Sequence, residues 1–138
     1  MAATPEREPR SLQRVSISPM VLLALRVTMA AVFVGGGILK LGGAEAMIRL
    51  FADIDLGQWL RYVVGIVELV GGTLLLVPSW SVFAAIGLIV LMIGAAMAEL
   101  FILRRPPIAA AACAVALMIL AIGALDQPHP LPRSGREE

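Results

Sequence analysis

Four long apolar runs dominate this chain of 138 residues. They cover residues 20–41, 60–77, 82–103 and 108–125. A helix that crosses a bilayer needs roughly 20 mainly apolar residues, and each run approaches that length. Hydrophobic residues make up 59% of the chain, and the mean hydropathy is +0.91, whereas a soluble domain is only about half apolar. We therefore expect an all-α integral membrane protein with four spanning helices.

Prolines and short connections support these four spans. Ser18-Pro19 is a typical helix start, with a capping hydroxyl before a proline at the first helical position. Pro78 ends the second run, and Pro106-Pro107 separates the third run from the fourth. Helices that are joined by short connections pack as antiparallel neighbours. The sequence thus predicts one antiparallel four-helix bundle.

The longest connection, residues 42–58, has an amphipathic pattern. Five apolar residues recur at helical spacing among acidic and basic ones: Ala46, Met47, Leu50, Phe51 and Ile54. Such a pattern is typical of a short helix that lies on a membrane surface. We expect a short amphipathic segment here, and an ordinary loop is the alternative.

We expect loosely structured polar tails at residues 1–18 and 126–138, on either side of a membrane domain at residues 19–125. The N-terminal tail differs from a signal peptide, because Arg26 and Lys40 interrupt the apolar run that follows it. Basic residues bear only weakly on orientation. The tails contain Arg7, Arg10, Arg14, Arg133 and Arg136, and the opposite side would contain Lys40, Arg49, Arg61, Arg104 and Arg105. We expect a multi-pass protein of the inner (plasma) membrane, and from the clustered N-terminal arginines we predict that both termini lie in the cytoplasm.

Glycines within the runs predict where helices approach closely. Small residues allow the backbones of neighbouring helices to come together in lipid. The candidate packing positions are Gly37 in the first run and Gly65, Gly71 and Gly72 in the second. We expect them to pack helices within the chain, and homodimerisation through one of these faces is the alternative.

Four ionisable residues lie within or at the ends of the runs: Arg26, Lys40, Glu68 and Glu99. A charge in hydrocarbon costs several kcal/mol unless it is paired, so these residues form a candidate intramembrane polar site. With the helix ends aligned, Arg26 lies ~9 Å deep and Glu68 ~13 Å deep from the same side. By the same reasoning Glu99 lies level with Lys40. We therefore predict two ion pairs, Arg26–Glu68 and Lys40–Glu99, which either serve a function or only hold the helices together.

Several types of catalytic centre lack their usual residues. The one histidine, His129, lies in the C-terminal tail, and the one cysteine, Cys113, excludes an internal disulfide. No Cys/His cluster suits a metal, and no glycine-rich loop suits a nucleotide. The net charge of +1 indicates no nucleic-acid partner. We expect no catalytic centre, no metal site and no cofactor bound by this chain alone.

The charged and glycine positions together resemble the DoxX-like family of small four-helix membrane proteins. The resemblance rests on Arg26, Gly37-x-x-Lys40 and the run Gly65-x-x-Glu68-x-x-Gly71-Gly72, and it covers roughly residues 22–125. Some members are similar to the small subunit of a thiosulfate:quinone oxidoreductase, and others are associated with membrane oxidoreductase complexes. The resemblance therefore implies an oxidoreductase partner, with a quinone reached through the complex.

Three classes of function follow from these observations. The first is an accessory subunit of a membrane-associated, quinone-linked oxidoreductase complex, in which Glu68 accepts a proton. The second is a scaffold or assembly factor for membrane proteins, in which the charged pairs are structural. The third is a small-molecule transporter. A transporter needs a polar path through the membrane, and four short helices with four charges offer little of one, so this class is favoured least.

Overall fold

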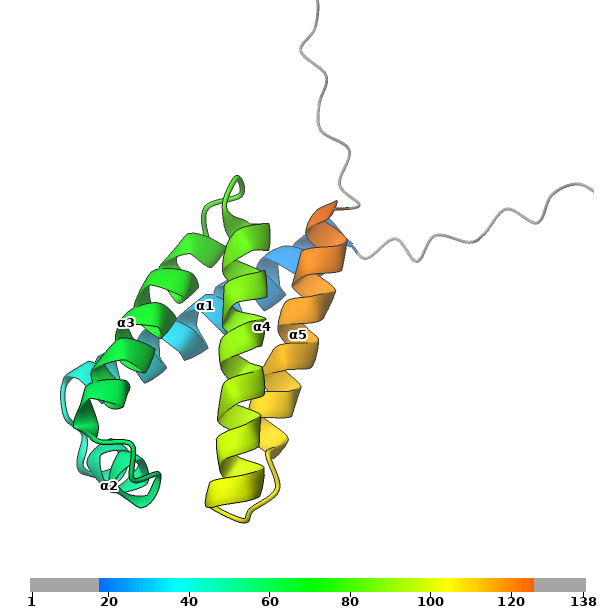
Figure 1. The fold of residues 1–138 in the computed structure, drawn as a ribbon. Helices are drawn as coiled ribbons and strands as arrows, with labels where there is room; N and C mark the ends of the chain where they lie inside the picture. Colours follow the sequence, from blue (N-terminus) through cyan, green and yellow to red (C-terminus); the bar gives the residue numbers. More distant parts are fainter. Residues whose placement is uncertain (1–17, 126–138) are drawn as a thin grey trace, which may run out of the picture.

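The computed structural model describes residues 18–125, which form helices and no strand. Figure 1 shows their arrangement. The elements are α1 (Pro19–Leu41), α2 (Glu45–Asp53), α3 (Gln58–Leu75), α4 (Ser81–Met97), the π-helix η1 (Ala98–Ile102) and α5 (Ile108–Leu125). The all-α prediction is confirmed, whereas the predicted tails lie outside the described residues.

The helix boundaries follow from local chemistry. Pro19 occupies the first turn of α1, as predicted, but the Ser18 side chain makes no capping hydrogen bond. At the other end, Gly42 donates its backbone N–H to the carbonyl oxygen of Ile38 at 2.8 Å. Gly57 precedes α3 with a φ of 84°, which a residue with a Cβ rarely adopts. Gly43, with a φ of 71°, and Gly57 thus allow the chain to turn on either side of α2.

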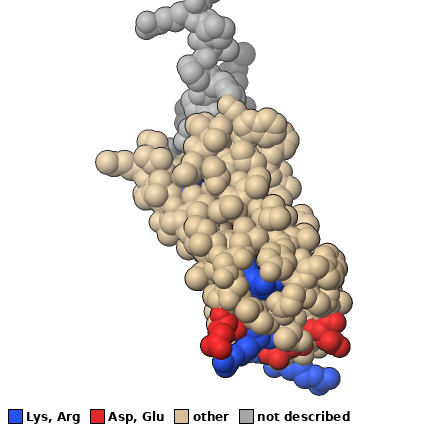
Figure 2. Space-filling view, turned by 90° about the vertical axis from the view of Figure 1, so that its left-hand side faces the viewer, with Lys and Arg blue, Asp and Glu red and all other residues tan. Residues whose placement is uncertain are grey.

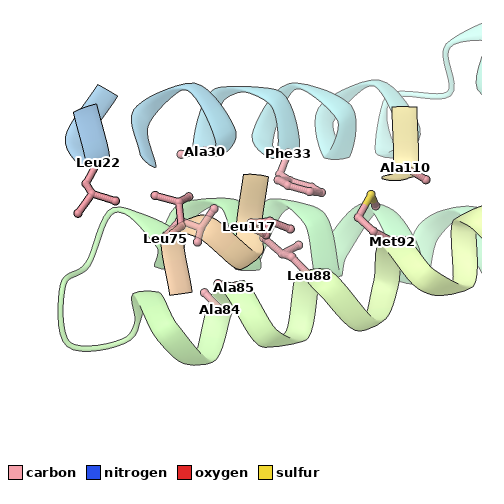
Figure 3. Packing of buried hydrophobic residues seen from close by; sticks show 11 residues of the cluster. Leu22, Ala30, Phe33, Leu75, Ala84, Ala85, Leu88, Met92, Ala110 and Leu117 are labelled. Carbon is pink, nitrogen blue, oxygen red and sulfur yellow. The ribbon is translucent and has the colours of Figure 1, made fainter. Parts of the chain in front are cut away.

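The four long helices pack as two neighbouring pairs. Helix α1 lies along α3, and α4 lies along α5 (Figure 1). Contacts between α3 and α4 and between α1 and α5 join the pairs. Leu75, Leu88 and Leu117 are fully buried between them, beside Phe33 (Figure 3). One apolar core therefore includes residues from all four long helices.

The beginning of α1 and the end of α5 lie at the same end of the molecule (Figure 1). Gly123 of α5 packs directly on Leu22 of α1, since a Cβ at Gly123 would lie 2.5 Å from a Leu22 methyl carbon. Helices α1 and α5 are therefore in direct contact at this end.

Among residues 18–125, three helical stretches are long and apolar enough to cross a membrane: Pro19–Leu41, Ser81–Ile102 and Ile108–Leu125. They correspond to the first, third and fourth predicted spans. Helix α3, which corresponds to the second, is not among them, and Gln58, Arg61 and Glu68 lower its hydropathy. The outer surface of these helices is apolar, with Phe83, Val90 and Val115 all more than half exposed. Large exposed apolar patches of this kind mark a surface that faces lipid or a partner.

Two elements refine the predicted pattern. The amphipathic connection contains the nine-residue helix α2, with Phe51 buried and Glu45 and Asp53 exposed. The third run is helical to Ile102, but its last turn is the π-helix η1. A π-helical turn inside an apolar run is frequent at functional sites, and its hydrogen-bond spacing has no simple sequence signal.

Candidate intramembrane polar site

The site begins with a close backbone contact between α1 and α3. A Cβ at Gly37 would lie 2.7 Å from the carbonyl oxygen of Gly65 and 2.9 Å from the backbone nitrogen of Leu69. About two turns further along α3, a Cβ at Gly72 would lie 3.0 Å from the backbone nitrogen of Val34. The backbones of the two helices come close together because Gly37, Gly65 and Gly72 carry no side chain. Gly71 faces α4 instead, where its absent Cβ leaves room for Leu88.

Glu68 lies at this contact and forms an ion pair with Lys40. The Lys40 Nζ donates to Glu68 Oε2 at 2.6 Å, and the two side chains are only 15% and 7% exposed. Gly36 makes room for the carboxylate, since a Cβ at that position would lie 3.2 Å from Oε2. The predicted pair Arg26–Glu68 is therefore wrong, although Glu68 is indeed a buried, paired acid.

The register of α1 on α3 explains this correction. The prediction aligned the ends of the two helices, but Gly37 lies opposite Gly65 and Phe33 lies opposite Gly72. The first turns of α1 therefore extend past α3 and reach α5. Arg26 belongs to that part of α1, where it is half-buried and has no ion-pair partner within residues 18–125. Lys40 lies near the Glu68 level, and its long side chain covers the remaining distance.

Arg61 is a functional-site residue that the sequence reasoning missed. Its side chain is buried, with a relative exposure of 4%. Arg61 Nη1 donates to the backbone oxygen of Lys40, and Arg61 Nε donates to Gln58 Oε1 at 2.9 Å. Gln58 in turn donates to the carbonyl oxygen of Ile48 at 3.1 Å. The spacing of Gln58 and Arg61 by three residues could have indicated their mutual contact, but no local pattern points to the contact of Arg61 with the Lys40 carbonyl.

The network fixes the residue that pairs with Glu68. Arg61 satisfies a carbonyl at the C-terminal end of α1, where a cation also interacts favourably with the helix dipole. The carbonyl belongs to Lys40. Arg61 therefore binds the backbone of Lys40, and Glu68 binds its side chain. Through Gln58 the network also reaches α2. One connected set of polar contacts therefore positions α1, α2 and α3 around Glu68.

Glu99 lies elsewhere, so the predicted pair Lys40–Glu99 is also wrong. Glu99 Oε1 accepts a hydrogen bond from Arg105 Nη2 at 2.7 Å, across the turn that follows η1. Its other oxygen, Oε2, is buried and has no hydrogen-bond partner among the described residues. The structure thus brings Lys40 and Glu68 together and separates both from Arg26 and Glu99. Most of the acidic and basic side chains on the face shown in Figure 2 gather at one end of the molecule.

The chemistry available at the site is that of a shielded carboxylate and an ammonium group. The pair is neutral as a whole, which lowers the cost of placing it among apolar helices. An opposite charge at 2.6 Å also allows a proton to be exchanged between partners without a net charge being created. Among residues 18–125, no group of three or more His, Cys, Asp or Glu side chains could hold a metal ion.

Comparison with known proteins places this arrangement in a family. The model of the DoxX-like family matches residues 24–124, which include the α1–α3 contact and both members of the ion pair. The chain belongs to the DoxX-like family. This DoxX-like protein is 28% identical over 104 residues to the uncharacterized protein YdgD of Bacillus subtilis, covering 72% of this chain and 91% of YdgD.

A second relative from the same organism is the putative oxidoreductase CatD. It is 38% identical to this DoxX-like protein over 52 residues, which are 38% of the chain and 39% of CatD. The match therefore covers about two fifths of either protein. No solved structure is significantly similar to the chain.

Proposed function

We propose that this DoxX-like protein is an accessory subunit of a membrane-associated, quinone-linked oxidoreductase complex, without a catalytic centre of its own. The observation that carries the proposal is the buried Lys40–Glu68 pair at the α1–α3 contact. A buried ion pair is weak evidence of stability, because desolvation offsets its attraction. Ionisable residues inside a membrane domain are characteristic of proton and substrate sites. The similarity to the putative oxidoreductase CatD supports a link to redox chemistry.

The proposal includes an antiparallel four-helix bundle in which α3 also spans the membrane. The polar groups of α3 are bonded inward, Arg61 to the end of α1 and Glu68 to Lys40. Its outward residues are apolar, with Val63, Ile66 and Val70 exposed. Charged side chains that pair within a bundle are tolerated in a spanning helix. Helix α2 then lies at the membrane surface.

A quinone takes up two electrons and two protons when it is reduced, and the partner subunit would supply the electrons. Within this chain, Lys40 holds a proton on Nζ and Glu68 Oε2 accepts that hydrogen bond. A positioned acid–base pair contributes typically 10²–10⁴-fold to proton transfer. The proposed role of Glu68 is to hold and pass on a proton at the interface with the partner, where quinone would be reached.

The second candidate is a scaffold or assembly factor. The observation that favours it is the continuous network from α2 through Gln58 and Arg61 to Lys40, which orders the helices whether or not Glu68 takes part in chemistry. A transporter ranks below both. Homodimerisation remains a proposal, although Gly37, Gly65 and Gly72 are occupied by contacts within the chain.

Co-purification tests the proposed function. We expect the tagged protein, taken from native membranes in mild detergent, to retain a partner that carries flavin or haem and reduces a soluble quinone analogue. The double variant Lys40→Met/Glu68→Gln, which leaves no stranded charge, should lower this activity ~10-fold or more without loss of the partner, because the proton-accepting group is removed. Glu45→Gln is the control, since Glu45 lies in an exposed pair on α2. Turnover or a stoichiometric chromophore in the isolated chain would overturn the proposal, and a captured partner without redox activity would favour the assembly factor.

We also propose that both termini face the cytoplasm of the inner (plasma) membrane. The described ends of α1 and α5 lie together, so a tag at either terminus reports on the same side. In intact cells, a C-terminal tag should resist added protease, and a tag inserted beside exposed Asp55 in the α2–α3 connection should be cleaved. The reverse pattern would mean that the chain is inserted in the opposite orientation.

A further inference from the structure

A hollow in the apolar surface lies between α4–η1 and α5, away from the Lys40–Glu68 pair. Its volume is about 250 Å³. Met92, Ala96 and Leu100 line one side, and Pro107, Ala111 and Ala114 line the other, with three further apolar residues. Small-molecule pockets usually span about 300–1,000 Å³ and contain a few polar groups. This hollow is smaller and entirely apolar, which suits a single hydrocarbon chain.

The hollow has the depth of one membrane leaflet. The residues that line it on α4 and η1 run from Met92 to Leu100, a rise of ~12 Å. Half of a hydrocarbon core is ~15 Å thick. Its two ends along the chain, Leu100 and Pro107, flank the turn that joins two candidate spans. That turn therefore lies at the level of the lipid headgroups, and the hollow runs inward from it.

The same turn presents two consecutive arginines, Arg104 and Arg105. Arg104 is exposed and has no ion-pair partner within residues 18–125. Arg105 is half-exposed and forms an ion pair with Glu99. The excess positive charge at the headgroup end of the hollow complements a headgroup with a net negative charge better than a zwitterionic headgroup, in which a cation neutralises the phosphate. Arginine guanidinium groups bind phosphate in bidentate fashion.

From this combination we infer that the α4–η1/α5 hollow binds one anionic phospholipid. One acyl chain lies between Ala96 and Ala111, and the phosphate lies at Arg104 and Arg105. A bulk attraction of anionic lipid to any basic residue would need no hollow, and an apolar partner helix would need no arginine. The inference thus requires both features and is independent of the proposed redox role.

Native mass spectrometry of the full-length protein in detergent tests this site. The delipidated protein is offered equal amounts of phosphatidylglycerol and phosphatidylcholine with the same acyl chains. We expect phosphatidylglycerol to be retained about five-fold more, the effect of roughly one basic residue near anionic lipid. Arg104→Gln should abolish the preference, and Arg49→Gln should preserve it, since Arg49 is an exposed arginine at the same end.

The hollow itself is tested by Ala111→Leu, which should fill it and reduce lipid retention several-fold. Ala112→Leu is the matched control, because Ala112 is exposed on α5 but does not line the hollow. Inorganic phosphate and glycerol 3-phosphate should not displace the lipid. Equal retention of the two lipids, equal effects of Arg49→Gln and Arg104→Gln, or displacement by free phosphate would overturn the inference. A dimer that forms without lipid and is lost in Ala111→Leu would assign the hollow to a second copy of the chain.

Discussion

Glu68→Gln is expected to destabilise the purified protein by about 3–5 kcal/mol, the usual cost of breaking a buried ion pair by removing one partner. The Lys40 ammonium would then lie 15% exposed among apolar helices without its counter-charge. Lys40→Met should cost a similar amount, because it strands the buried carboxylate. The double variant should be milder than either single change, since no isolated charge is left. Thermal unfolding in detergent, read as a double-mutant cycle, measures the coupling between the two residues.

Two comparisons make this cycle decisive. The exposed pair Glu45–Arg49, at 3.3 Å, should show a coupling of only ~0.2–1 kcal/mol. Arg26→Gln should be additive with Glu68→Gln, since Arg26 belongs to a part of α1 that extends past α3. Strictly additive losses for Lys40 and Glu68, or strong coupling between Arg26 and Glu68, would contradict the observed pairing.

Gly37→Ala is expected to lower the free energy of unfolding by about 1–3 kcal/mol through overpacking. The new methyl group would meet backbone atoms of α3, the Gly65 oxygen at 2.7 Å and the Leu69 nitrogen at 2.9 Å. Backbone cannot rotate away as a side chain can, so α1 and α3 must separate. Separation would also pull Lys40 from Glu68, and the loss should therefore be coupled to the ion pair.

Gly35→Ala provides a matched control within the same glycine triplet. A Cβ at Gly35 has nothing within 4 Å, and alanine is favoured over glycine inside a helix by roughly 0.5–1 kcal/mol. This variant should be neutral or slightly more stable than the native protein. If Gly37→Ala and Gly35→Ala behave alike in thermal unfolding, the close α1–α3 contact does not exist in solution.

Much of the fold could be predicted because membrane helices have strong local signals. Apolar length located all four long helices, and prolines located their ends. The spacing of apolar and charged residues in 42–58 indicated the helix that became α2. These features depend on the residues within each segment alone, and hydropathy is sufficient to read them.

The pairing of charges could not be predicted in the same way. The partner of Glu68 depends on how far α1 slides along α3, which Gly37 and Gly72 determine by close packing rather than by alignment of the helix ends. A shift of about two helical turns between the aligned and the observed register moved the predicted partner from Lys40 to Arg26. Glu99 was paired with Lys40 because both were expected at the same depth in the membrane. The chain turns back after η1, however, and Arg105 in that turn forms the ion pair with Glu99.

Arg61 was missed for a related reason. In the sequence it is one basic residue near a helix start, typical of an exposed interfacial position. In the structure it is buried, and it donates to the Lys40 carbonyl at the end of α1. Only the arrangement of three helices makes that carbonyl available, so local patterns contain too little information to predict the contact.

The Lys40→Met/Glu68→Gln double variant tests whether the Glu68 carboxylate takes part in proton transfer. The measurement is the quinone-reductase activity of the co-purified assembly. The double variant has no stranded charge, so it should fold and retain its partner nearly as well as the native protein. We expect its activity nevertheless to be reduced ~10-fold or more, because the carboxylate that accepts a proton is absent. Native activity in the stable double variant would contradict a role of Glu68 in proton transfer and show that the pair only holds α1 against α3.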